Sequence, residues 1–195
     1  MLGTAGAPSA TRLAVLLSND WHERSAQTVC ERYRAHVAVS VWGHEAARGR
    51  VACTITDVAR DGDILPGGVR AHELGTPHLS EVAFYLPLHR APVCADSLIG
   101  VGGDRVRVAP AWWAGSRPEA QERYRARLRP SLRRLADLPL EMLLTSHGPR
   151  VLNGGRAALA EALDAPAWGE DRSDRSGDTL RATGRTPPRS RTSTI

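Results

Sequence analysis

Three short polar motifs each border an apolar run of strand length, and this arrangement constrains the fold more than any other feature of the chain. Residues 75–78 read GTPH and precede the apolar run at 82–86. Asp96 ends a second apolar run, and His147 ends a third. Short, continuous apolar runs are typical of strands that are buried on both faces. No single motif is specific, but their order and spacing together are.

The order of these motifs resembles the metallo-β-lactamase superfamily, and the resemblance covers residues 13–163. It implies a mixed α/β fold, a four-layer αββα sandwich in which metals lie at one edge between two sheets. His78 matches the histidine of the family's third motif, Asp96 matches the aspartate that bridges two metals, and His147 matches the last histidine. The resemblance therefore implies these three residues as metal ligands, for zinc or alternatively for iron or manganese.

The family's first motif, T-H-x-H-x-D-H, is rewritten in this chain. The apolar run at 13–17 and Ser18 match the strand and the threonine that open it, so the register needs no gap. The residues at the positions of the family's His, His, Asp and His are Asn19, Trp21, Glu23 and Arg24. Asparagine is a poor zinc ligand, tryptophan is none, and arginine brings positive charge to a cation site. Most of the ligands that this motif contributes in the family are therefore missing.

Three residues of the same loop are candidates for restoring the chemistry. Glu23 keeps a carboxylate where the family has aspartate, although its longer side chain shifts the oxygen. A one-residue shift of the loop would let Asp20 and His22 replace the lost pair. We therefore predict Asp20, His22 and Glu23 as candidate catalytic residues beside the three metal ligands. The alternative for His22 is that it opens the following helix on its exposed face.

Two functions follow from the resemblance. The first is a hydrolase-like protein that acts on a small-molecule ester, thioester or lactone, because a bound cation would lower the pKa of water toward neutrality. The alternative is a non-catalytic binding or scaffold protein that has lost its metals. In that case His78, Asp96 and His147 would form only a hydrogen-bonded polar cluster that keeps the strand ends in place.

The composition of the two ends sets the predicted domain limits. Residues 1–11 are small and polar, and residues 165–195 have almost no large apolar side chains, so both are predicted to be disordered. The domain is predicted over 12–164. Few residues precede its first strand, so we expect either that the protein starts upstream of Met1 or that the first sheet is incomplete. An incomplete sheet would have an exposed edge that favours a homodimer. A period-four apolar pattern predicts helix over 118–136, with a kink or a new first turn at a proline within it.

The net charge and the cysteines indicate which partners and which cellular compartment to expect. The chain has a formal net charge of +5 and contains no lysine. Its arginines are scattered over predicted exposed faces, so we do not expect nucleic-acid binding. The three cysteines lie among apolar neighbours and form no C-x-x-C pair, which predicts buried free thiols in a reducing compartment. The apolar runs are much shorter than a membrane span and no signal peptide is evident, so we expect a cytoplasmic protein.

Overall fold

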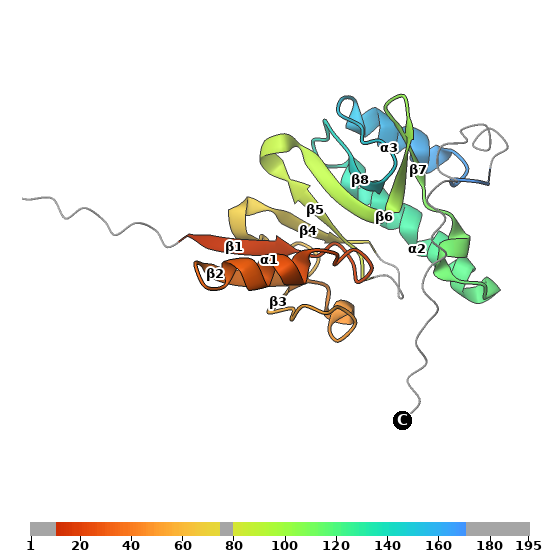
Figure 1. The fold of residues 1–195 in the computed structure, drawn as a ribbon. Coiled ribbons are helices and arrows are strands. Elements are labelled where there is room, and N and C mark those ends of the chain that lie inside the picture. The colour runs from red at the N-terminus through yellow and green to blue at the C-terminus, as the bar shows by residue number, and fades with distance from the viewer. Residues whose placement is uncertain (1–10, 75–79, 171–195) are drawn as a thin grey trace, which may run out of the picture.

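The computed structural model describes residues 11–74 and 80–170, which form two β-sheets and three α-helices (Figure 1). The first sheet is parallel and has the strand order β1-β2-β3. Its strands are β1 (Arg12–Leu16), β2 (Ala38–Gly43) and β3 (Asp57–Val58). The second sheet has the order β4-β5-β6-β7, with β8 parallel to β6. Its strands are β4 (Arg70–Glu73), β5 (Val82–Leu86), β6 (Ala91–Gly102), β7 (Arg105–Val108) and β8 (Leu144–His147).

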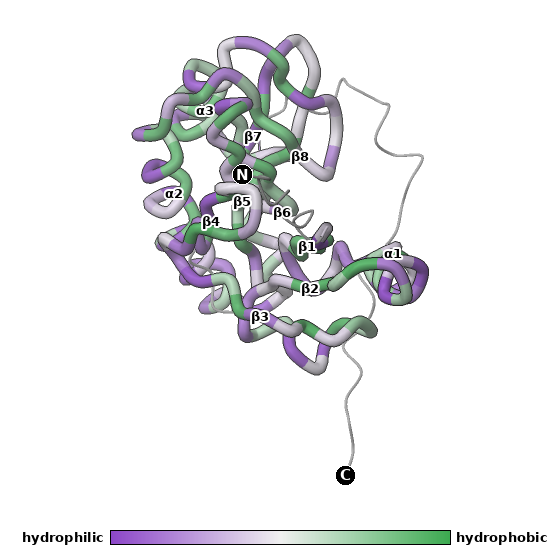
Figure 2. The backbone as a smooth tube through the Cα atoms, turned by 90° about the vertical axis from the view of Figure 1, so that its left-hand side faces the viewer, coloured by the Kyte–Doolittle hydropathy of each residue, from purple (hydrophilic) through white to green (hydrophobic). Residues whose placement is uncertain are grey.

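The elements stack in four layers, and a separate apolar cluster fills each space between layers. The helices are α1 (Ala26–Tyr33), α2 (Pro118–Ala136) and α3 (Gly155–Asp164). One cluster joins α1 to the first sheet, and the largest joins α2 and α3 to the second sheet. A third cluster lies between the sheets, where Leu16 and Trp42 of the first sheet meet Phe84 of the second. Figure 2 shows that α1 and α2 carry both hydrophobic and hydrophilic residues, as helices that cover a sheet do. The predicted αββα order of layers is therefore present.

Strand β6 is the longest strand described, and the backbone of its middle residues is not fully paired by the neighbouring strands. The antiparallel ladder with β5 reaches only to Val93, and the ladder with β7 begins at Leu98. The parallel ladder with β8 shifts its register between Cys94 and Ile99. Backbone N–H groups in this middle segment therefore need acceptors other than a regular ladder, because buried N–H groups are nearly always paired.

Helix α2 runs through Pro130 as one helix of 19 residues, so the alternative that a second helix begins at this proline is wrong, and the kink stays a prediction. The proline removes one backbone hydrogen bond, but Leu128 and Leu132 on either side are almost fully buried and hold the helix against the sheet.

The arginines of α2 are not all solvated. Arg129 donates hydrogen bonds to carbonyl oxygens at the end of α3, including that of Leu163, where a cation is favoured. Arg134 pairs with a carboxylate before β4.

The packed chain extends past residue 164, into the segment that the composition assigns to the tail. Ala167 is buried, and the N–H of Trp168 donates to the carbonyl of Val108 at 2.9 Å. The Trp168 ring also packs against the largest apolar cluster. Residues 165–170 are therefore part of the domain, because Trp168 supplies apolar area that the rest of the predicted tail lacks.

Two further predictions concern the cysteines and the membrane. Cys30, Cys53 and Cys94 are buried and free, as predicted. In the part of the chain that the structure describes, each helix is too short or too polar to cross a bilayer.

Candidate metal centre

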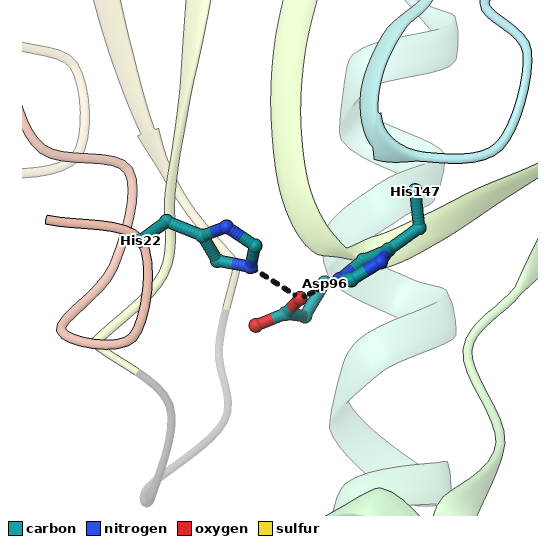
Figure 3. Close-up of side chains that lie close together, drawn as sticks. All are labelled: His22, Asp96 and His147. Carbon is teal, nitrogen blue, oxygen red and sulfur yellow. Dashed lines mark hydrogen bonds and ion pairs between the residues drawn. The ribbon is translucent and has the colours of Figure 1, made fainter. Parts of the chain in front are cut away.

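Three side chains from distant parts of the chain meet between the two halves of the fold (Figure 3). The Nε2 atoms of His22 and His147 each lie 2.8 Å from Oδ1 of Asp96. Their ligand atoms all lie within 4.8 Å of one another, and no other group of three such residues was found among residues 11–74 and 80–170. The two imidazole rings are close to perpendicular, with centroids 5.3 Å apart. Both rings therefore present a nitrogen to the same carboxylate oxygen, and we call this group the triad.

The loop after β1 carries His22 to the triad, and Asn19 sets the shape of that loop. The Asn19 side-chain oxygen accepts hydrogen bonds from the N–H groups of Trp21 and His22, both at 3.0 Å. Such Asx turns are a common use of asparagine. Its amide nitrogen then donates to Oδ2 of Asp96 at 2.6 Å. Arg24, just beyond, has a φ of 26°, which few non-glycine residues adopt. This tight turn points His22 inward before α1 begins.

Asp96 is held as a carboxylate by its neighbours. It is 3% exposed, and burial alone would raise its pKa. Hydrogen bonds from His147 and His22, together with the positive charge that these rings can carry, outweigh burial and bring the pKa of Asp96 well below its usual range. The same hydrogen bond raises the pKa of His22, against burial and the nearby Arg24 charge, which lower it. Asp96 is therefore a negatively charged carboxylate, and both imidazole rings contact its Oδ1 atom.

Glu81 lies behind Asp96 and holds the backbone that carries it. It is 2% exposed, and its carboxylate accepts the N–H groups of Ala95 at 2.9 Å and of Asp96 and Ser97 at 3.2 Å. The Ser97 hydroxyl donates a further bond at 2.7 Å. These acceptors serve the middle segment of β6. Burial raises the pKa of Glu81 to about 7; the Ser97 hydroxyl opposes this rise and the Asp96 charge adds to it.

A close backbone approach fixes His147 at the end of β8. Gly148 has a φ of 71°, and a Cβ atom there would lie 1.9 Å from the carbonyl oxygen of Gly100. Only glycine tolerates both the conformation and the contact. On its other side the His147 ring meets Trp113 in an edge-to-face contact, with centroids 5.4 Å apart. The ring is thus held by the chain that follows it and by one aromatic wall.

The structure brings together His22, Asp96 and His147, but it gives the other predicted residues different surroundings. Asp20 is 8% exposed, lies 2.8 Å from the Arg50 guanidinium and accepts the Ser80 hydroxyl at 2.5 Å. Glu23 accepts the N–H of Ala52 at 2.5 Å. Both carboxylates therefore organise loops rather than join the triad. His78 lies outside the described residues.

Sequence reasoning did not find Asn19 and Glu81 as functional residues. The comparison with the family's first motif presents Asn19 only as a poor metal ligand, and the tendency of asparagine to form Asx turns is the signal that points to its contacts in the structure. Glu81 directly precedes the apolar strand at 82–86, and an acidic residue beside such a run needs a reason when it is buried. Its partners lie 14 to 16 residues away in the sequence, so the residues alone do not identify them.

A cleft of about 330 Å³ opens next to His22, between the loop after β1 and strands β6 and β8. Apolar side chains form part of its wall, and hydroxyl groups and one arginine form the rest. The lining residues are Ser18, His22, Arg24, Val93, Cys94, Leu144, Thr145 and Ser146. His22 is thus the member of the triad that borders this cavity, which has both apolar and polar surface.

The donors of the triad suit a divalent cation. Two imidazoles and a carboxylate are a usual set for zinc with one position left open, and also for non-haem Fe(II). Cation binding requires both Nε2 atoms without protons, so the contacts of His22 and His147 with Asp96 would be exchanged for contacts with the cation. The residues present therefore fit one metal ion. In the described chain they provide no second set of ligands for a dinuclear site.

Three solved structures are similar to this chain in fold. A metallo-β-lactamase from Pontibacter korlensis has a TM-score of 0.53 and 16% identity, covering 79% of this chain and 70% of that one. A metallo-β-lactamase family protein from Thermus thermophilus has a TM-score of 0.50 and 17% identity, covering 78% of this chain and 60% of that one. A protein solved in a di-iron-bound form has a TM-score of 0.51 and 23% identity, with 74% of each chain covered.

These likenesses establish the fold. The chain has the metallo-β-lactamase fold, which confirms the fold class expected from its motifs. It spans 60% of the length of the Thermus thermophilus protein. No protein-family model and no curated protein matches the sequence.

Proposed function

We propose that this chain is a hydrolase-like protein of the metallo-β-lactamase fold with a mononuclear metal site made of His22, Asp96 and His147. The observation that carries the proposal is the convergence of their three ligand atoms within 4.8 Å. His147 and Asp96 resemble ligands of the family, and His22 from the rewritten motif joins them. The site is thus rebuilt with a different residue rather than emptied.

A cation held by the triad would supply Lewis-acid activation of a substrate carbonyl and of water at neutral pH. The chain's own residues set the geometry. Asp96 stays ionised across the neutral range, because its pKa is held low. Asn19 orients its second oxygen, and the buried Glu81 fixes its backbone. Such outer contacts usually change metal affinity by about 10- to 100-fold.

The proposed substrate is a small molecule with an ester, thioester or lactone bond. Two features support this class. The cleft beside His22 has the volume of a small-molecule site, and its apolar wall would exclude water from part of a bound ligand. The metal of the proposal is zinc, iron or manganese. One similar structure holds two iron atoms, whereas the described residues of this chain offer ligands for one ion.

A second function is favoured by a separate observation. Both oxygens of Asp96 already have donors within the protein, from His22, His147 and Asn19. A buried carboxylate that is fully paired is stable without a cation. The triad would then be a hydrogen-bonded cluster that joins the two sheets, and the protein would be a binding or scaffold domain.

Metal content separates the two functions. The protein is loaded with zinc, iron or manganese, desalted and analysed for bound metal, and hydrolysis of a panel of esters, thioesters and lactones is measured in parallel. The same measurements are made on His22→Ala and on His36→Ala, an exposed histidine that follows α1 and is not part of the triad. The hydrolase proposal expects near one metal per chain and hydrolysis, both lost in His22→Ala and both kept in the control. A wild-type chain that retains no metal contradicts it and supports the scaffold.

A further inference from the structure

The cleft next to His22 is lined by one arginine and by no carboxylate. It contains the cation Arg24 and three hydroxyl groups. Arg24 is exposed. In the part of the chain that the structure describes, no carboxylate pairs with it, whereas Arg50 on the facing loop is paired with Asp20 at 2.8 Å. Arg24 is thus a charged group that is available to a ligand.

The backbone at Arg24 is held in an unfavourable conformation. Its φ of 26° lies in the region that favours glycine. A non-glycine residue keeps such a conformation only where its surroundings require it, and these positions cluster at ligand sites. Here the turn places Arg24 in the same cleft as His22.

We infer that this cleft binds an anionic group of the substrate, a carboxylate or a phosphate, with Arg24 as its charged partner. The inference rests on the proposed function, because the cleft would hold the part of the substrate next to the bond that is broken. A guanidinium group matches the paired oxygens of both anions in a bidentate manner. The hydroxyl of Ser18 is a further donor in the cleft.

The apolar side of the cleft sets what the anion is attached to. Val93 and Leu144 contribute apolar surface. A volume of about 330 Å³ lies at the lower end of small-ligand pockets. The ligand class is therefore a small, partly apolar molecule with one oxyanion, rather than a polymer or a long lipid.

Binding of simple anions to chelator-treated, metal-free protein tests this inference without relying on a metal or on hydrolysis. The probes are benzoate and phenylphosphonate, with neutral benzamide as the matched control ligand, titrated by NMR at mildly alkaline pH. The variants are Arg24→Gln and Arg127→Gln, an exposed arginine on α2. Both substitutions lower the net charge equally, so a general charge effect would appear in both.

The inference expects at least one anion to bind more tightly than benzamide and to shift signals of the cleft residues. Arg24→Gln weakens that binding by about tenfold, the loss expected for a hydrogen bond to a charged group, and Arg127→Gln leaves it unchanged. A preference for benzoate assigns the carboxylate, and a preference for phenylphosphonate assigns the phosphate. Equal binding by wild type and Arg24→Gln, or no binding beyond that of benzamide, overturns the inference. Neither result depends on metal content, so failure of the proposed function is detected separately.

Discussion

Substitution of Glu81 by Gln tests whether burial raises the pKa of this acid behind the triad and so makes the stability of the fold depend on pH. Glu81 is 2% exposed, and its pKa rises from 4.5 to about 7. As pH rises from below 4.5, the unfolded chain ionises first, while the folded protein keeps the proton until about pH 7. The stability that the protonated side chain contributes at low pH is therefore lost as pH rises through the folded pKa. A shift of this size corresponds to about 3 kcal/mol.

The assay compares the free energy of unfolding of metal-free wild type and Glu81→Gln in urea at about pH 5 and about pH 8. Glutamine has the same shape but cannot ionise. It also places an NH₂ group against a backbone N–H, which costs about 1–3 kcal/mol at both pH values. The difference between variant and wild type should therefore move by about 2–3 kcal/mol in favour of the variant on going to the higher pH. Other titrating groups, Asp96 and His22 among them, are common to both proteins and largely cancel.

Glu122→Gln is the matched control, because Glu122 is exposed on α2. Its difference from wild type should stay constant over the same pH interval. If the Glu81→Gln difference is also constant, the hydrogen bonds from Ala95, Asp96 and Ser97 fully offset burial. The reasoning that burial dominates at this side chain would then be refuted.

Three further substitutions test the packing around the site by urea unfolding. Gly148→Ala should cost about 3 kcal/mol, because its Cβ would lie 1.9 Å from a carbonyl oxygen, and an unchanged stability would contradict that close approach. Leu132→Ala should cost about 2–5 kcal/mol, since Leu132 is 0% exposed beneath α2, and a loss near zero would remove it from the core. Asn19→Ala should cost about 1–3 kcal/mol by leaving a buried oxygen of Asp96 without a donor, and wild-type stability would contradict that contact.

Parts of the fold were predictable from apolar patterns that indicate burial, although the alternating pattern at 50–58 predicts a strand that the structure has only at 57–58. The apolar run at 82–86 predicts a strand that is buried on both faces, and β5 occupies those residues. The period-four apolar pattern predicts α2, and the helix continues through Pro130 because the leucines on either side of it are buried. His147 ends β8, whereas Asp96 lies in the middle of the neighbouring β6 rather than at a strand end, and the pairing of these two strands brings the two side chains together.

The rest of the site depends on loop conformation, which has no period in the sequence. Counting from Ser18 places His22 at a position that the family does not use for a ligand. The Asx turn at Asn19 and the reversed φ of Arg24 instead direct its ring to Asp96. Spacing alone does not specify these dihedral angles. The homodimer expected from the short first sheet stays a prediction, as do the cytoplasmic location and the absence of nucleic-acid binding.

The central claim is that His22 has joined two family-like ligands in a one-metal site. X-ray absorption at the zinc edge, on zinc-loaded wild type and His22→Ala, tests it most directly because it counts imidazole ligands. The account predicts two imidazoles with oxygen ligands in wild type, and weaker or no zinc retention with one imidazole lost in the variant. A wild-type chain that retains no zinc, or a spectrum that is the same in both proteins, would contradict it.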